Sequence, residues 1–138
     1  MTNPTLISLN DAQLTPQRPE EDIRDRDVLD AEGEKIGHVR DLLIDDEEKK
    51  VRFFEVAHGG FLGLGEERLI VPVDNITRVA EDGVHIDRDR QIVAGSPVYD
   101  PKLARAADYY DTVYGHYGVM PYWSAGYAYP PYPYGGAL

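Results

Sequence analysis

The chain has 138 residues, a formal net charge of −11 and no cysteine. This length suits one small domain with extensions and argues against two-domain cofactor enzymes, because one core is usually built from about 100–150 residues. The absence of cysteine excludes a disulfide scaffold, a thiolate nucleophile and a cysteine-ligated metal site. The chain shows neither a secretory signal at its start nor an apolar run of the roughly 18–20 residues needed to cross a membrane. We therefore expect a cytoplasmic protein with no transmembrane segment.

The charge balance bears on the class of partner. The sequence holds 25 acidic and 14 basic residues, and no basic run is longer than Lys49-Lys50. Nucleic-acid binding normally depends on clustered Lys and Arg that neutralise phosphates. Direct nucleic-acid binding is therefore disfavoured, and a protein partner is expected.

Composition divides the chain into an N-terminal arm (1–24), an acidic aliphatic domain (25–98) and an aromatic C-terminal part (99–138). All ten tyrosines and the single tryptophan lie at or after Tyr99. The arm carries one short apolar stretch, Leu6–Leu9, which either adds a strand to the main sheet or belongs to a disordered terminus.

The middle part reads as consecutive short strands separated by turn residues. Apolar and β-branched residues recur at strand spacing, with no helical periodicity between them. Pro72 indicates an edge strand or a bulge, because proline cannot donate to a sheet ladder. The pattern predicts a mainly β fold, a small antiparallel barrel or sandwich. Its expected strands are 26–29, 35–45, 51–58, 68–73, 75–79 and 83–87.

One helix is expected over residues 100–115. Asp100 is suited to the N-cap, Pro101 to the first helical position, and Gly115 to the position just past the end. Apolar residues at three- and four-residue spacing form a contact face that lies on the barrel or on a second subunit. This face comprises Leu103, Ala106, Ala107, Tyr110, Val113 and Tyr114.

A Tyr/Pro/Gly-rich tail follows from residue 117 and cannot form a core of its own. Three alternatives stay open for it: a disordered, self-associating segment, a segment that wraps its own barrel, or a ligand for a partner domain.

The order of motifs in residues 25–98 resembles the PRC-barrel family. The stretches that carry this resemblance are 27–45, 51–56, 59–66 and Leu69-Ile70-Val71-Pro72-Val73. PRC-barrels form the cytoplasmic domain of the photosynthetic reaction centre H subunit and the C-terminal domain of a ribosome maturation factor, and they occur as stand-alone proteins. The resemblance implies a β-barrel of about five or six strands that acts in docking or assembly, with no catalytic residues to carry over. It assigns structural roles to Gly33, Gly37, Asp45 and Pro72.

The glycine-rich loop of residues 59–65 is the predicted interaction loop. It lacks the Lys-Ser/Thr of a phosphate loop and is followed by Glu66-Glu67, whose carboxylates would repel a phosphate. Its apolar tip would be an exposed contact surface. The residues of this loop are Gly60, Phe61, Leu62, Gly63 and Leu64.

Neither a metal site nor a cofactor site is predicted. The acidic run 45–48 does not keep the register of a calcium loop and is interpreted as a solvated hairpin turn. The histidines lie far apart in the sequence, so only the fold could bring them together as ligands. They are His38, His58, His85 and His116.

The sequence as a whole favours a non-enzymatic adapter that forms a homodimer or higher oligomer, of the kind often assigned to stress physiology. Two other functions stay open. One is a ribosome or RNA-maturation accessory protein, and the other is a small metal- or cofactor-dependent enzyme.

Overall fold

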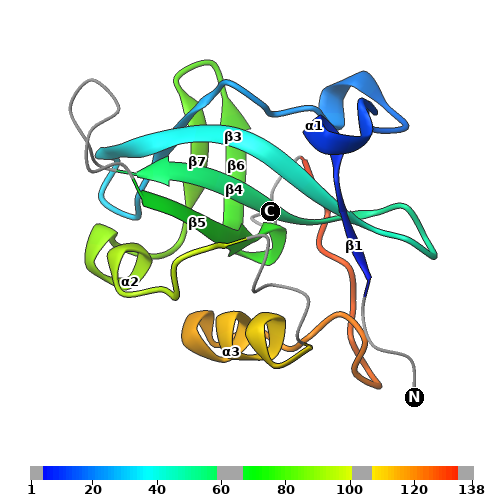
Figure 1. Cartoon of the computed structure of the whole chain (residues 1–138). Helices are drawn as coiled ribbons and strands as arrows, with labels where there is room; N and C mark the ends of the chain where they lie inside the picture. The colour runs from blue at the N-terminus through cyan, green and yellow to red at the C-terminus, as the bar shows by residue number, and fades with distance from the viewer. Residues whose placement is uncertain (1–4, 59–66, 101–106, 134–138) are drawn as a thin grey trace.

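A computed structural model of the protein describes residues 5–58, 67–100 and 107–133. Seven strands form one sheet in the order β5-β4-β3-β2-β7-β6, and β1 pairs with β3. Figure 1 shows that the sheet is strongly curled around the long strands β3 and β4, with α3 lying beneath it. The strands are β1 (Leu6–Ser8), β2 (Asp27–Leu29), β3 (Lys35–Asp45), β4 (Val51–His58), β5 (Glu67–Pro72), β6 (Ile76–Ala80) and β7 (Gly83–Ile86). The helices are α1 (Leu9–Ala12), α2 (Arg90–Ala94) and α3 (Ala107–Tyr117), with single 3-10 turns η1 (Pro19–Glu21) and η2 (Val73–Asn75).

The mainly β prediction is confirmed, and the predicted strands agree with β2 to β7 to within one residue at each end. Pro72 ends β5, which pairs only with β4 among the described residues and is therefore an edge strand there. The arm also supplies a strand, because β1 pairs antiparallel with the end of β3.

The predicted closed antiparallel barrel needs two corrections. First, β2 and β7 run parallel, so the sheet is mixed. Second, β5 and β6 end the strand order and are not paired with each other in the described residues, so the curled sheet stays open there. At the outer edge of β5, the backbone N–H of Tyr99 donates to the carbonyl of Arg68 at 2.7 Å, and this contact occupies a position that a closing strand would need.

The β3–β4 ladder contains two bulges. Val39 pairs with Val56 and Asp41 with Glu55, which leaves Arg40 as an extra residue in β3. A bulge turns its extra residue out of the regular alternation and can re-aim its side chain. In the same way Leu43 pairs with Phe53 and Ile44 with Val51, so that Arg52 is an extra residue in β4.

Two of the glycines assigned structural roles occupy positions that favour glycine. Gly33 has a φ of +83° in the turn between β2 and β3, a backbone conformation that side chains disfavour. Gly37 lies between β2 and β4, and a Cβ atom there would stand 2.1 Å from the carbonyl oxygen of Ala57. The strand β4 therefore approaches β3 closely at this point.

The helix α3 lies beneath the sheet. Tyr110, Val113 and Tyr114, from the predicted contact face, are buried in the core of their own chain. Tyr114 and Tyr110 stack on Phe53 of β4, with ring centroids 4.8 and 5.7 Å away. Leu103, Ala106 and the side chain of Ala107 lie outside the described residues.

The predicted end of the helix needs correction, since α3 continues past Gly115 to Tyr117. Gly118 ends it with a φ of +69°, and the N–H of Val119 caps the carbonyl of Tyr114 at 3.0 Å. The predicted start at Asp100 and Pro101 borders residues that the structure does not describe.

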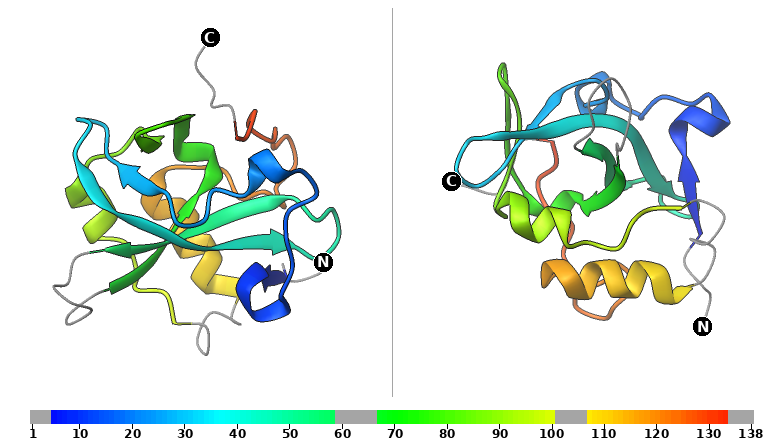
Figure 2. Two further views of the ribbon diagram at one scale, coloured as in Figure 1. Left: turned by 90° about the horizontal axis from the view of Figure 1, so that it is seen from above. Right: turned by 60° about the vertical axis from the view of Figure 1, so that its left-hand side comes forward.

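The segment from Gly118 to Pro133 has no helix or strand and runs back along the sheet, as the two views of Figure 2 show in orange and red. The side chains of Tyr122, Trp123 and Tyr129 pack on the core, and Tyr132 is buried in it. Among the three alternatives for the tail, these contacts match a segment that wraps its own domain. In the part of the chain described here, the helices are too short or too polar to span a bilayer.

Candidate functional site

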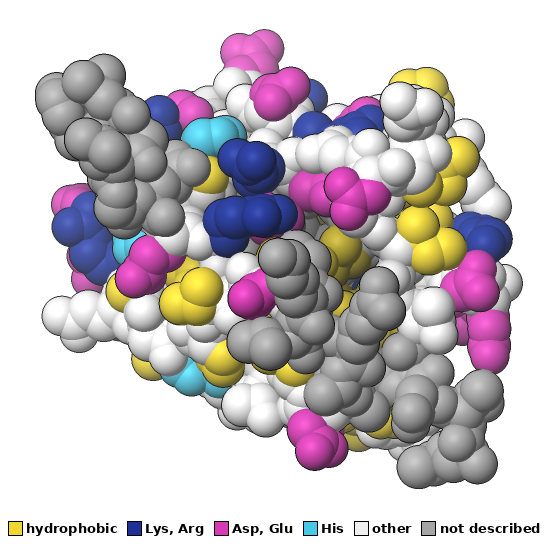
Figure 3. Space-filling model, in the orientation of Figure 1, with side chains coloured by type: hydrophobic (Ala, Val, Ile, Leu, Met, Phe, Trp, Pro, Cys, Tyr) yellow, Lys and Arg dark blue, Asp and Glu magenta, His cyan; other side chains and the backbone are white. Residues whose placement is uncertain are grey.

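A small pocket of about 110 Å³ opens where α1, β3, β4 and β5 meet. Figure 3 shows the face of the molecule that is turned toward the viewer in Figure 1, where Lys and Arg side chains gather near the middle, next to acidic ones. We call this pocket the arginine pocket. It is lined by Ser8, Asn10, Asp11, Arg40, Asp41, Glu55, Arg68 and Tyr99.

Glu55 is the anchor of the arginine pocket. It lies in the middle of β4 and its side chain is 0% exposed. Arg68 binds it through two nitrogens, Nε at 2.5 Å and Nη2 at 3.0 Å, and the Nε of Arg40 lies 3.4 Å away. A buried carboxylate requires such partners because burial without them is costly. The rest of both guanidiniums reaches solvent, since their side chains are 39% and 50% exposed.

Asp41 is the second buried carboxylate in the lining of the arginine pocket, and it pairs in register with Glu55 across the β3–β4 ladder. It accepts hydrogen bonds from the Ser8 hydroxyl, from the backbone N–H of Asn10 at 3.1 Å and from that of Leu42 at 2.7 Å. Ser8 also caps α1, because its Oγ accepts from the N–H of Asp11 at 3.1 Å. Asp41 therefore fixes the N-terminal arm, and its hydrogen bonds come from uncharged groups.

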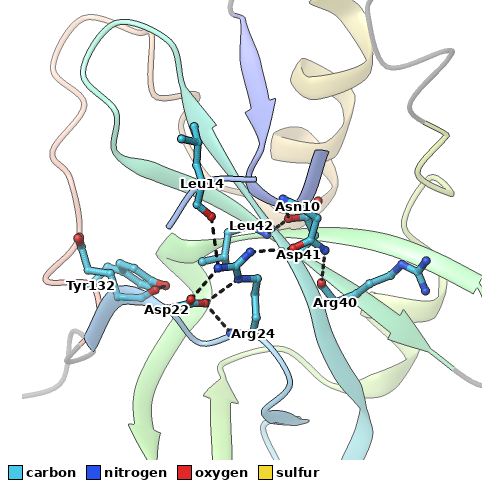
Figure 4. Close-up of polar contacts among 9 residues, drawn as sticks. Asn10, Leu14, Asp22, Arg24, Arg40, Asp41, Leu42 and Tyr132 are labelled. Carbon is cyan, nitrogen blue, oxygen red and sulfur yellow. Dashed lines mark hydrogen bonds and ion pairs between the residues drawn. The ribbon is translucent and has the colours of Figure 1, made fainter. Parts of the chain in front are cut away.

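A neighbouring hollow of about 350 Å³ shares Asn10 and Arg40 with the arginine pocket. Figure 4 shows Arg24 at its centre, clamped between Asp22 and Asn10. Arg24 donates to both carboxylate oxygens of Asp22 at 2.8 and 2.7 Å and to Asn10 Oδ1 at 2.8 Å. The hydrogen bond from Arg24 lowers the pKa of Asp22 below its usual value. The guanidinium of Arg24 is thus hydrogen-bonded to groups of its own chain. The side chain of Arg40 points away from Arg24 (Figure 4).

Arg52 forms a separate site at the other bulge, and its side chain is only 2% exposed. Its Nε donates to Asp45 at 2.9 Å and its Nη2 to Glu48 at 3.0 Å. Burial alone would raise the pKa of Asp45, but the N–H of Glu48, the Arg52 guanidinium and the N–H of Lys50 together hold that pKa below its usual value. Asp45, assigned a structural role from the sequence, therefore organises the β3–β4 turn and holds a buried cation.

Three tyrosine rings complete the surroundings of Arg52. The guanidinium carbon lies 4.3 Å from the ring centroid of Tyr122, 5.3 Å from that of Tyr129 and 5.9 Å from that of Tyr127. Cation–π contacts of this kind are worth about 2 kcal/mol or more when the cation is desolvated. We call Arg52 with its ion-pair partners Asp45 and Glu48 the Arg52 site.

Three of the four histidines contact separate partners. His58 contacts the carbonyl of Ile36 at 2.7 Å, His116 that of Ile92 at 2.6 Å, and His85 the carboxylate of Asp82 at 2.8 Å. Within the described ranges, the structure brings together no group of three or more His, Asp or Glu side chains that could hold a metal ion.

The family model of the PRC-barrel domain matches residues 20–93, more than half of the chain. The chain belongs to the PRC-barrel domain family. No curated protein matches it. The matched span of the PRC-barrel domain contains β2 to β7 and both bulge arginines, whereas α3 and the segment after it lie beyond the match.

The residues of the arginine pocket were not singled out by the sequence reasoning, which favoured the loop 60–64 outside the described residues. One signal was present: Glu55 lies between Phe54 and Val56, in the apolar middle of β4. A carboxylate at such a position needs a basic partner from a neighbouring strand. The partners depend on the register of β5 against β4, which places Arg68, and on the bulge in β3, which places Arg40. The pattern reveals neither of these.

Proposed function

We propose that this PRC-barrel domain protein is a non-enzymatic assembly module and that it binds a protein partner through the arginine pocket. PRC-barrel domains commonly mediate protein interactions. The observation that carries the proposal is the pair of half-exposed guanidiniums, Arg40 and Arg68, both held on the fully buried Glu55.

This arrangement suits recognition of a carboxylate from a partner. The Nε of each arginine is directed inward at Glu55, and the solvent-exposed part of each guanidinium can donate further N–H bonds. Because one buried carboxylate fixes both side chains, less rotamer entropy is lost on binding than for free surface arginines. Arginines positioned in this way are enriched among the residues that dominate protein interfaces.

Affinity capture from the native cell with the full chain, followed by binding measurements with each purified partner, tests this function. We expect Arg40→Gln and Arg68→Gln to weaken partner binding at least tenfold, as expected for loss of a charge-assisted hydrogen bond at an interface (about 1.4 kcal/mol or more). Arg78→Gln is the matched control, because Arg78 is an exposed arginine of β6 that does not line the pocket.

Equal affinity of all three variants for every captured partner would contradict the arginine pocket as the binding surface. A catalytic turnover that depends on Glu55 or Asp41 would contradict the non-enzymatic function itself. The predicted loop 60–64 stays a second proposed contact, tested by Phe61→Ser in the same assay. Homo-oligomer formation is likewise a proposal, tested by light scattering.

A further inference from the structure

The C-terminal strap, residues 118–133, is held on the sheet by side chains. The Tyr127 hydroxyl donates to Asp74 Oδ2 at 2.7 Å, and the Tyr129 hydroxyl donates to the carbonyl of Val51 at 3.0 Å. The Tyr129 ring also lies under the ammonium group of Lys50, 5.0 Å from the centroid. These contacts fix the strap at several points along its length.

Main-chain pairing contributes nothing to this attachment. In the described ranges, the main-chain hydrogen bonds of residues 120–133 are local turns within the strap, and none reaches the sheet. A segment whose contacts with the sheet come from its side chains resembles a bound peptide ligand. Its tyrosine rings surround Arg52, and the hydroxyls of Tyr127 and Tyr129 donate to groups outside the strap.

Charge favours the same interpretation. Residues 117–138 contain no Asp, Glu, Lys or Arg, although the whole chain carries −11. An uncharged strap can therefore approach a second acidic copy without direct charge repulsion. The Arg52 site offers it a buried cation whose ion-pair partners, Asp45 and Glu48, both come from the sheet side.

We propose that the Arg52 site is a receptor for an extended tyrosine-bearing segment, and that the strap of a second copy of this chain occupies it in exchange for the copy's own strap. Each copy carries one receptor and one strap, so reciprocal exchange closes a symmetric dimer in which the partner supplies the three rings around Arg52. The tethered strap is present at a high effective concentration, so exchange increases with protein concentration.

Complementation between two full-length variants tests the exchange. The receptor-deficient variant is Asp45→Asn with Arg52→Met, which removes the ion pair without leaving either charge unpaired. The strap-deficient variant is Tyr122→Ala, Trp123→Phe and Tyr129→Ala, which keeps the receptor but holds its own strap weakly. Trp123 is the only tryptophan of the sequence, and its ring centroid lies 5.6 Å from that of Tyr114. Because the strap-deficient variant lacks it, tryptophan emission from a mixture reports only the strap of the receptor-deficient variant.

We expect the receptor-deficient variant alone to show red-shifted Trp123 emission, because its strap is released into water. On mixing at equal concentration, the emission should return toward that of the natural chain and light scattering should detect a heterodimer. Unchanged emission and mass on mixing would overturn the proposal. So would natural emission from the receptor-deficient variant alone, because the strap would then not depend on Arg52.

A second measurement covers the case in which the receptor-deficient variant fails to fold, as judged by circular dichroism. A labelled synthetic peptide of residues 118–133 is titrated into the natural chain and into the strap-deficient variant. Binding at least tenfold tighter to the strap-deficient variant is expected, because in the natural chain the receptor is already occupied. Equal or absent binding to both would overturn the proposal.

Discussion

The β2–β3 hairpin needs glycine at two positions for two different reasons, backbone conformation at Gly33 and lack of space at Gly37. At Gly33 a Cβ atom meets open space and the cost of Ala is the backbone conformation alone, about 1–2 kcal/mol. At Gly37 the added atom would collide with the carbonyl of Ala57, so β3 and β4 would have to separate. We expect Gly37→Ala to lower the free energy of unfolding by more than Gly33→Ala, measured by urea denaturation. Equal losses would contradict the close approach of the strands.

Asp45 makes stability depend on pH through its buried ion pair with Arg52. Asp45→Asn leaves the guanidinium without its closest carboxylate and should cost about 3–5 kcal/mol at neutral pH. Since the pKa of Asp45 is held below its usual 3.8, its stabilisation is fully present above that pH and is lost as the pH falls through the lowered value. The difference between the natural chain and the variant should therefore shrink in acid.

Asp46→Asn is the control for this prediction. Asp46 is the next residue of the same turn, but it is exposed and its carboxylate pairs with the ammonium group of Lys49, at 3.0 Å. An exposed pair of this kind is worth about 0–1 kcal/mol. A pH profile in which Asp46→Asn behaves like Asp45→Asn would contradict the special role of burial.

At the scale of elements, the strap should be released in alkali. Burial raises the pKa of Tyr122 in the strap to about 12, above the usual 10.0. Because folding favours the neutral phenols, the stabilisation is fully present below pH 10 and is lost as the pH rises through 12. We expect phenolate absorbance in the folded natural chain to rise at higher pH than in the same chain unfolded in urea, with a red shift of Trp123 emission over the same pH range. Coincident titration curves for the folded and the unfolded chain would contradict burial of the strap tyrosines.

The elements also show what a single sequence can and cannot reveal. The strands are predictable because Gly33 and the acidic turn 46–49 separate runs of alternating apolar residues. The helices α1 and α2 were missed because four or five residues are too few to show a helical period. The arginine pocket was missed because a bulge at Arg40 depends on how two strands pair, which one strand cannot encode alone.

For the whole molecule, the net charge of −11 implies self-repulsion in the compact state. Raising the ionic strength from about 0.01 to about 0.1 M shortens the Debye length from about 30 to about 10 Å and screens this repulsion. We expect the unfolding temperature to rise over that range, because the buried pairs at Arg52 and Glu55 are screened much less. A fall in unfolding temperature would indicate that surface ion pairs outweigh the repulsion.

The two bulges of the β3–β4 ladder have a joint consequence. The register of the ladder shifts by one residue at Arg40, between the pairs Val39–Val56 and Asp41–Glu55. It shifts back by one residue at Arg52, before the pair Ile44–Val51. The extra residue in one strand is thus cancelled by the extra residue in the other. Because each arginine is the extra residue of its own bulge, deleting either one alone would straighten that bulge and leave the pairs on both sides of it in register. Each of the two bulges can therefore be lost without the other, and the hairpin keeps its alignment either way.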